Sequence, residues 1–372
     1  MTTAFTVIGG IGLFLLGISL MTDGLKSLAG NMLKQLLSKF TGGLFPSILS
    51  GATITSIIQS SSATMFMTIG FVNAGLLTFD QAVGVILGAN LGTSSIGWIV
   101  SLIGFKVKMG VISLPLIGIG VLLKMFSRER FAPHGMVLAG FGLLFFGIDV
   151  LQQGMAGFNE KLHFEAFSAN TFINRFILII IGIVMTIVMQ SSSAAFVTTL
   201  TALNAHTVTF SQAAELAIGQ YIGTTFKSFI ASLGGTVGAK QTATAHVMFN
   251  LLIGLISFLI LPLLISAAYW LSKWLSIADQ ATQLALFHTI FNVFGVTCTL
   301  LVLPLFKKLI LRLVPNKGVE LTKYLNSSVT EVPSVALEAV RRSLIKIMKT
   351  VVKSSKQLFI NKKARSEERR VG

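Results

Sequence analysis

The hydrophobic positions of this 372-residue chain fall into long runs separated by glycine, proline and charged residues. Several runs are long enough for a helix that crosses the hydrocarbon core of a bilayer, which is about 30 Å thick and needs roughly 20 residues. They cover residues 5–22, 82–104, 109–126, 134–152, 213–233, 244–270 and 284–306. The pattern therefore predicts an all-α polytopic membrane protein with about seven full spans.

Two further apolar segments, residues 44–77 and 173–204, carry polar residues at their centres. The sequence Gln-Ser-Ser-Ser begins at Gln59 in the first segment and at Gln190 in the second. Each segment is too long for one helix and too short for two crossings, so each is expected to form a re-entrant hairpin with this motif at its tip. Irregular backbone at that depth is tolerated only where protein or a water-filled cavity surrounds it.

The two hairpins belong to an internal repeat. Residues Gly51–Gly104 match Gly182–Gly235 without a gap at a constant offset of 131, with roughly twenty of 54 positions identical. Upstream, the stretch that begins at Gly12 resembles the one that begins at Gly142. Equivalent points are separated by three expected crossings, an odd number, so the second copy is predicted to be inverted relative to the first. Inverted repeats with broken helices are typical of secondary transporters.

Composition and charge agree with this interpretation. Apolar residues make up 53% of the chain and charged residues only 11%, whereas about a quarter of a soluble domain is charged. The net charge of +16 does not indicate nucleic-acid binding, because 16 basic against 5 acidic residues follow Phe306. A basic cluster next to the last span is typical of the cytoplasmic side of a cell membrane. The C-terminus is therefore expected in the cytoplasm and the N-terminus outside.

Three parts of the chain follow from these patterns. The first inverted repeat is expected over 1–130, the second repeat with the final span over 131–306, and a basic tail over 307–372. Apolar and basic residues alternate at helical spacing in this tail, which predicts an amphipathic helix able to lie on anionic lipid. The single cysteine, Cys298, excludes an intramolecular disulfide and is expected to be a packing residue.

The hairpin tips combine two kinds of ligand group. The helix that returns from each tip begins with unpaired N–H groups and the positive end of its dipole, which attract an anion. Serine hydroxyls add neutral donors, while hydroxyl and amide oxygens can coordinate a small cation such as Na⁺. Close helix packing is the alternative role for small serines in a membrane protein. The duplication of the motif in both repeats favours ligand binding.

A second repeated motif follows each hairpin, with two glycines four residues apart and a hydroxyl pair directly after them. The first copy runs from Gly88 to Ser94 and the second from Gly219 to Thr225. Such spacing also occurs at helix-packing faces. In this repeat, unwinding at the second glycine would free backbone carbonyls for a cation.

The paired tips and the motifs that follow them resemble the type II sodium/phosphate cotransporter family, in its bacterial branch. The similarity covers roughly Phe5–Phe306. It implies a carrier that couples Na⁺ to inorganic phosphate, without catalytic residues or an organic cofactor. It also implies that the tail begins a helical domain similar to the phosphate-regulatory PhoU proteins. The oligomeric state stays open, a homo-oligomer included.

The expected sites follow from the motifs and the resemblance together. Phosphate is expected to bind the serines of both tips: Ser60, Ser61, Ser62, Ser191, Ser192 and Ser193. Sodium is expected to bind oxygen-bearing residues of both motifs: Gln59, Asn90, Thr93, Ser94, Gln190, Thr224 and Thr225. The second repeat departs from the first at Gln220-Tyr221, which replaces Ala89-Asn90, and at Lys227, which replaces Ile96. Lys227 is a candidate charge partner for the anion, with snorkelling to an interface as the alternative.

Two other patterns are open to more than one interpretation. The sequence His-x-x-Phe-Asn occurs at His246 and at His288, and it predicts hydrogen bonds between helices or a role near the ion path. A serine hydrolase would need a base oriented on a serine, and no such base is duplicated with the tips. A carrier for another oxyanion, a Na⁺-independent phosphate exporter and a channel are the alternatives to sodium-coupled phosphate transport.

Overall fold

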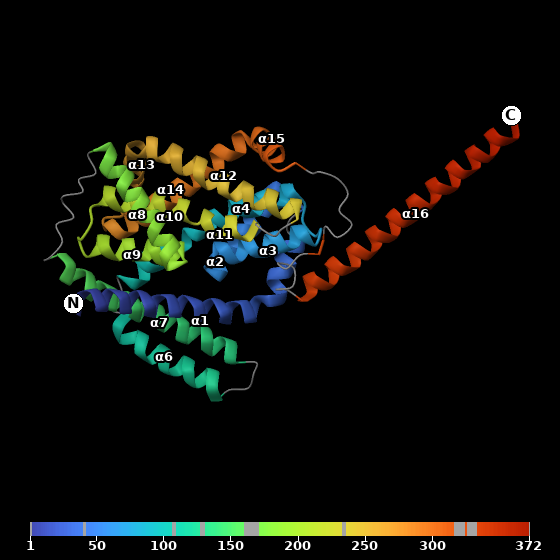
Figure 1. Cartoon of the computed structure of the whole chain (residues 1–372). Coiled ribbons are helices and arrows are strands. Elements are labelled where there is room, and N and C mark those ends of the chain that lie inside the picture. The colour runs from blue at the N-terminus through green and yellow to red at the C-terminus, as the bar shows by residue number, and fades with distance from the viewer. Residues whose placement is uncertain are drawn as a thin grey trace.

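The computed structural model describes residues 2–39, 42–105, 109–126, 131–159, 171–232, 236–315, 324–325 and 333–371. Parts of the predicted basic tail, residues 316–323, 326–332 and 372, lie outside the described residues. Within the described chain the regular elements are all helical, and most of them form one elongated bundle from which the C-terminal helix projects (Figure 1).

The helices follow the order of the repeats. Those of the first repeat are α1 (Thr2–Lys39), α2 (Leu44–Ile58), α3 (Ser61–Asn73), α4 (Phe79–Thr93), α5 (Ser95–Ile99), the π-helical turn η1 (Val100–Gly104) and α6 (Met109–Phe126). Those of the second are α7 (Ala132–Asn159), α8 (Phe172–Met189), α9 (Ser192–Asn204), α10 (Phe210–Gly223), α11 (Thr225–Ser232), α12 (Val237–Leu259), α13 (Leu261–Trp274), α14 (Gln280–Leu301) and α15 (Leu303–Leu313). The tail helix is α16 (Pro333–Val371).

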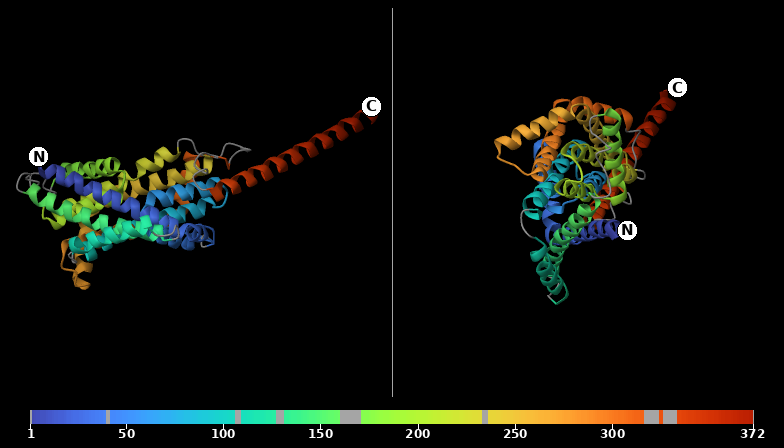
Figure 2. Two further views of the ribbon diagram at one scale, coloured as in Figure 1. Left: turned by 90° about the horizontal axis from the view of Figure 1, so that it is seen from below. Right: turned by 90° about the vertical axis from the view of Figure 1, so that its left-hand side faces the viewer.

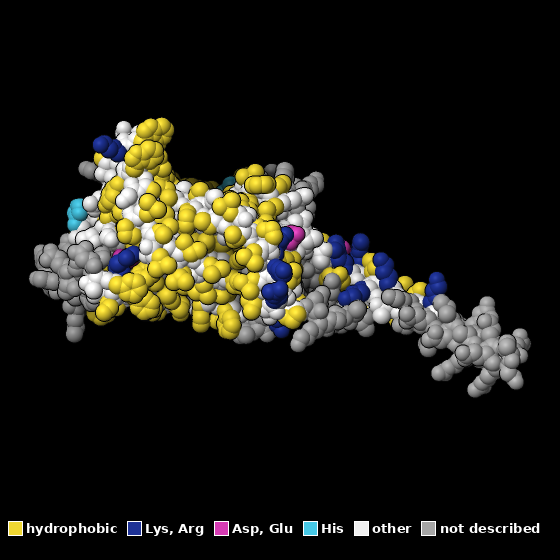
Figure 3. Space-filling view, turned by 90° about the horizontal axis from the view of Figure 1, so that it is seen from above, with side chains coloured by type: hydrophobic (Ala, Val, Ile, Leu, Met, Phe, Trp, Pro, Cys, Tyr) yellow, Lys and Arg dark blue, Asp and Glu magenta, His cyan; other side chains and the backbone are white. Residues whose placement is uncertain are grey.

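Six helical segments of the described chain are long and apolar enough to cross a membrane: Thr3–Leu28, Phe79–Gly104, Ala132–Ala156, Phe172–Met189, Val237–Leu259 and Gln280–Leu301. Two shorter apolar helices, Leu44–Ile58 and Val111–Phe126, accompany them. The face in Figure 3 is largely apolar between its two ends, and lysine and arginine gather toward α16. The prediction of an all-α polytopic membrane protein is confirmed. The number of crossings and the two hairpins stay predictions.

Four of the expected spans are divided between helical elements of the structure: 82–104, 213–233, 244–270 and 284–306. The span expected over 244–270 consists of two helices, because α12 ends at Leu259 and α13 begins at Leu261. Pro262 stands in the first turn of α13, where its missing N–H costs no helical hydrogen bond. The span expected over 213–233 is likewise divided, between α10 and α11.

Helices α2 and α4 pack closely enough to require glycine between them. A Cβ atom placed on Gly88 of α4 would lie 1.8 Å from the backbone oxygen of Ile48 on α2. In the second repeat, a Cβ on Gly219 of α10 would lie 2.1 Å from the backbone oxygen of Ile179 on α8. These four residues are equivalent at the offset of 131. The two repeats therefore build the same helix pair on the same glycine contact.

Helices α1 and α7 meet along a seam of glycines at one side of the bundle (Figures 1 and 2). Three glycines seven residues apart on α1 each face one residue of α7: Gly10 faces Leu151, Gly17 faces Leu144 and Gly24 faces Val137. The partner numbers fall along α7 as they rise along α1, so the helices are antiparallel. This arrangement agrees with an inverted repeat, and the inversion relative to the membrane stays a prediction.

The C-terminal helix α16 begins against the first repeat and then extends away from the bundle (Figure 2). Val335 and Ala339 are buried in an apolar cluster with residues of α2, α3 and α4. Arg342 donates a hydrogen bond to the backbone oxygen of Gly75, in the turn after α3. The hydrogen bond from Arg342 also lowers the pKa of Glu338. The first turns of α16 are thus anchored on protein, and its contact with lipid stays a prediction.

A buried ion pair is present in the second repeat without a counterpart in the first. Arg175 of α8 lies 3.2 Å from the carboxylate of Glu215 on α10, whose side chain is fully buried. Arg175 also donates to the backbone oxygen of Phe258 at 2.7 Å and lies over its ring. The equivalent positions of the first repeat hold Leu44 and Gly84. The pair therefore joins α8, α10 and the end of α12.

Replacing Arg175 with leucine is expected to destabilise the protein strongly, because it leaves the Glu215 carboxylate buried without a partner. Breaking a buried pair in this way costs about 3–5 kcal/mol. The double variant Arg175→Leu, Glu215→Gln is expected to recover part of the loss, since no charge stays buried. Thermal unfolding of the purified protein in detergent measures both variants, and equal melting temperatures for the two would contradict the explanation.

Candidate functional site

The two Gln-Ser-Ser-Ser motifs form the same unusual backbone turn. Gln59, between α2 and α3, has a φ of 57°, and Gln190, between α8 and α9, has a φ of 53°. A left-handed conformation is uncommon for a residue other than glycine. The next residue, Ser60 or Ser191, is extended, and its hydroxyl accepts a 3.2 Å hydrogen bond from the N–H three residues on. Each first serine thus caps the helix that follows it.

The helices are only slightly distorted at the end of the two glycine motifs, which run from Gly88 to Ser94 and from Gly219 to Thr225. Ser94 and Thr224 keep helical φ values of −65° and −63°. The carbonyls that unwinding was expected to free accept hydrogen bonds from nearby hydroxyls. Thr93 donates to the backbone oxygen of Asn90 at 2.6 Å, and Thr224 donates to that of Tyr221 at 2.7 Å. In this conformation a cation would have to replace those hydroxyl protons as the partner of each oxygen.

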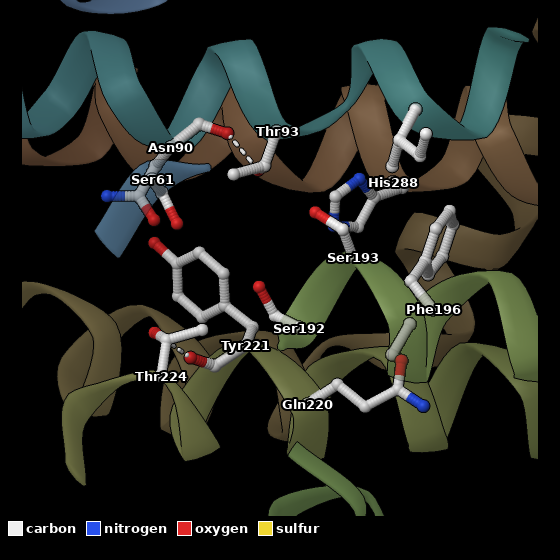
Figure 4. A pocket seen from close by; sticks show the side chains of 12 residues that line it. Ser61, Asn90, Thr93, Ser192, Ser193, Phe196, Gln220, Tyr221, Thr224 and His288 are labelled. Atoms are coloured by element: carbon white, nitrogen blue, oxygen red, sulfur yellow. Dashed lines mark hydrogen bonds between the residues drawn. The ribbon is translucent and has the colours of Figure 1, made fainter. Parts of the chain in front are cut away.

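A small central cavity lies where the two repeats meet (Figure 4). It is lined by residues of both repeats. Six of the predicted site residues belong to its wall: Ser61, Asn90, Thr93, Ser192, Ser193 and Thr224. Figure 4 shows Ser61, Asn90 and Thr93 facing Ser192 and Thr224 across this space. The structure thus brings the tips of both predicted hairpins to one site.

Sequence reasoning assigned no ligand role to three polar residues of this cavity: Gln220, Tyr221 and His288. The hydroxyl of Tyr221 is buried and makes no hydrogen bond to the described residues. Gln220 donates to Thr199 at 2.7 Å, while its side-chain oxygen has no partner there. An unpaired buried polar group costs about 1–3 kcal/mol, so these atoms are suited to meet a polar ligand. The sequence signal that could have identified Tyr221 as a site residue was its alignment with Asn90, an expected sodium ligand.

Among the described residues, those that line the central cavity include no charged side chain. The helices α3 and α9 begin at this wall, with Ser61 and Ser192. The first N–H groups of a helix have no acceptor within the helix, and the helix dipole adds roughly half a positive charge there. Two such ends beside several hydroxyls suit the binding of an oxyanion.

A second, smaller cavity lies beside the first and shares Ser192 and Thr224 with it. Its wall includes Ser62, Gln190, Ser191 and Lys227 from the predicted set. The ammonium of Lys227 donates a hydrogen bond to the backbone oxygen of Gln190. Lys227 is therefore directed at the tip of the second repeat.

The remaining predicted residues, Gln59, Ser60, Ser94 and Thr225, line neither of these two cavities. The amide of Gln59 donates to Ser95 Oγ at 3.0 Å, which ties the first tip to α5. Thr225, the first residue of α11, donates to the backbone oxygen of Ile222 on α10 at 2.8 Å.

The two His-x-x-Phe-Asn motifs lie behind the second motifs of opposite repeats. Asn250 of α12 donates to Thr224 Oγ1 at 2.7 Å, and Asn292 of α14 donates to Ser94 Oγ at 3.1 Å. His246 lies 2.7 Å from Ser228 Oγ through its Nδ1 atom. The predicted hydrogen bonds between helices are present, and they hold the hydroxyl pairs of both repeats in place.

The sequence profile of the Na⁺/Pi-cotransporter family matches this chain twice, over residues 13–153 and 157–298. The two matches correspond to the two repeats and together cover most of the chain. This chain belongs to the Na⁺/Pi-cotransporter family. It is thus a member of a phosphate transporter family, and transporters are not enzymes.

Individual relatives agree with this family. YqeW of Bacillus subtilis (strain 168), a protein without an assigned activity, is 34% identical over 307 residues, which are 82% of this chain and 96% of YqeW. YjbB of Escherichia coli (strain K12), named as a candidate inorganic phosphate export protein, is 26% identical over 93% of this chain. The matched region is 63% of the length of YjbB.

A human member of the family gives a shorter match. Sodium-dependent phosphate transport protein 2B is 29% identical over 98 residues, which are 26% of this chain and 14% of the human protein. No solved structure matches the chain. The family's relatives thus include both a sodium-dependent transporter and a candidate phosphate exporter.

Proposed function

We propose that this protein is a sodium-coupled carrier of inorganic phosphate that works by alternating access in the cell membrane. The observation that carries the proposal is the central cavity, into which equivalent serines of both repeats project. A site built by two repeats can be reached from either side as one repeat moves against the other. A pore needs no such convergence on one closed site.

Phosphate would bind between the two tips. Ser61 and Ser192 are the first residues of α3 and α9 and line the cavity, and Ser193 adds a further hydroxyl. The hydroxyl of Tyr221, which is buried without a described partner, is a further donor for a phosphate oxygen. The hydroxyls of Ser62 and Ser191, in the adjoining cavity, would lie on the path of the ion to the site.

Sodium would bind nearest the second motif of the first repeat. Asn90, Thr93 and Ser94 offer amide, hydroxyl and backbone oxygens within one helical turn. These are hard neutral ligands of the kind that Na⁺ accepts. Gln59 lies behind them and would follow any change at the tip, because it is hydrogen-bonded to Ser95.

The chain would be oriented with its basic tail in the cytoplasm and its N-terminus outside, which places the anchor of α16 on the cytoplasmic side. The contact between Arg342 and Gly75 would then join the tail to the turn after the first hairpin. Purified protein in vesicles, treated with protease from one side, tests this orientation through cleavage after the tail's many basic residues.

Uptake of radiolabelled phosphate into proteoliposomes tests the proposed function. An inward Na⁺ gradient is expected to drive concentrative, saturable uptake, and an equal K⁺ gradient is not. Uptake that proceeds equally under both gradients would refute sodium coupling and favour the alternative, a Na⁺-independent exporter, to which the similarity with YjbB points. Sulfate and arsenate as competitors then separate a phosphate carrier from one for other tetrahedral oxyanions.

A further inference from the structure

Lys227 is the one charged side chain in the walls of the two cavities at the tips. It enters the smaller cavity together with Ser62, Ser191 and Ser192, which are expected phosphate ligands. Ser192 and Thr224 belong to both walls. The ammonium therefore lies in the space next to the proposed phosphate site.

The equivalent position of the first repeat holds Ile96, which is 1% exposed and lines the central cavity. The helices around Ile96 and Lys227 repeat closely. Thr55 on α2 faces Gly92 on α4. The equivalent residue Thr186 on α8 faces Gly223 on α10. Lys227 is thus a charge present at this position in the second repeat and absent from it in the first.

The ammonium of Lys227 has an acceptor that suits a cation. It donates to the backbone oxygen of Gln190, the C-cap residue of α8. The carbonyl groups at the C-terminus of a helix carry partial negative charge and favour a cation. In the first repeat, the residue equivalent to Gln190 is Gln59. The side-chain amide of Gln59 donates a hydrogen bond to Ser95.

Other partners for Lys227 do not explain its position. Among the described residues, no carboxylate contacts its ammonium, and Glu215 is engaged by Arg175 at 3.2 Å. A lysine that only snorkels would direct its ammonium away from the apolar layer and toward water. Here the ammonium is bound to the backbone oxygen of Gln190, an exposed residue of the tip, and the tip is the region where the symmetric sodium ligands are expected.

The repeats also differ at the position of Asn90, an expected sodium ligand of the first repeat. Tyr221 stands where the first repeat has Asn90, so an amide oxygen, which is a good neutral ligand for Na⁺, is replaced by a phenol. Tyr221 is buried, and its ring packs against Phe291. At this position the second repeat therefore has a phenol in place of an amide, while the neighbouring Gln220 brings an amide oxygen to the central cavity and Lys227 adds a positive charge.

We propose that the ammonium of Lys227 is a tethered cation that takes the place of a sodium ion in the second repeat, so that transported Na⁺ binds only in the first. This inference rests on the proposed sodium-coupled transport of phosphate. The ammonium supplies positive charge to the bound anion in every transport cycle without being released. The carrier would then move fewer Na⁺ per phosphate than a relative with two symmetric motifs.

Phosphate binding to the purified protein, measured with ³²P at several Na⁺ concentrations, tests the inference on the full chain. Lys227→Ile is expected to weaken phosphate binding about tenfold or more, as for the loss of one contact with a charged ligand. Lys227→Arg keeps the charge and is expected to retain part of the affinity. Lys240→Ile is the matched control, because Lys240 is exposed and lines neither cavity.

A second variant tests the exchange of lysine for sodium. Lys227→Ile combined with Tyr221→Asn restores the pattern of the first repeat. This double variant is expected to recover phosphate binding at high Na⁺ and to raise the Hill coefficient for Na⁺ above that of the wild type. Melting temperatures in detergent identify any variant whose loss of binding comes from unfolding.

The outcomes separate this inference from the proposed function. A wild type that transports phosphate with Na⁺, together with a folded Lys227→Ile variant of unchanged affinity and Hill coefficient, overturns the inference alone. A Hill coefficient that does not rise in the double variant overturns the exchange with sodium. A wild type whose phosphate binding does not depend on Na⁺ overturns both proposals, and that result is read from the wild type without any variant.

Discussion

Alanine at both Ser61 and Ser192 is expected to abolish phosphate transport at substrate concentrations that saturate the wild type. Both serines begin the helices that face the central cavity from opposite repeats. A hydrogen bond to a charged ligand contributes about 1.5–3 kcal/mol, so each single variant is expected to weaken phosphate binding about 10- to 150-fold. The double variant is expected to lose more than either, because the two hydroxyls come from different helices.

The measurement is the apparent phosphate affinity in proteoliposomes, with the amount of folded protein determined by size-exclusion chromatography. Ser266→Ala is a suitable control, because its hydroxyl is exposed and bonds only to its own helix at 2.8 Å. Both single variants should stay folded, since alanine is a good helix former. Single variants with wild-type affinity would remove the tips from the phosphate site.

Alanine at Gly88 is expected to disrupt the fold rather than the transport step. The added Cβ would lie 1.8 Å from the backbone oxygen of Ile48, so α2 and α4 would have to separate. Overpacking of this kind costs about 1–3 kcal/mol or more, which exceeds the gain of about 1 kcal/mol that alanine gives over glycine within a helix. The yield of folded protein and its melting temperature should both fall.

Gly118→Ala is the matched control, because Gly118 also lies within a helix and has no neighbouring atom within 4 Å of the added Cβ. That variant is expected to be as stable as the wild type or more stable. Gly219→Ala should behave like Gly88→Ala, since its contact in the second repeat is equivalent. If Gly88→Ala and Gly118→Ala melt at the same temperature, the close contact is not required.

The repeated sequence predicts much of the local structure, because the signals are short-range. The N-caps at Thr78 and Thr209, each with a glutamine three residues on, form the same capping box in both repeats. The positions of the tips also follow from the sequence, as four polar residues interrupt two apolar runs. The left-handed conformation of Gln59 and Gln190 does not follow, since glutamine has no local preference for it.

Other features depend on contacts between distant parts of the chain. The pairing of Arg175 with Glu215 joins residues of two helices that are 40 positions apart in the chain, so no local pattern predicts it. The break at Ile260 was also missed, because a proline in the first turn of a helix resembles one within a continuous span. The small extent of the break after Gly92 reflects hydroxyl groups that satisfy the local carbonyls.

The seam between α1 and α7 has a consequence for how the protein is made. The glycine face of α1 is completed by Leu144 and Leu151, which the ribosome adds more than a hundred residues later. Until α7 is made, the glycine face of α1 remains uncovered along one side of the helix. A nascent chain that stalls before α7 therefore exposes this face to any other small-residue helix nearby. Insertion of α7 is thus the step at which the glycine face of α1 is covered.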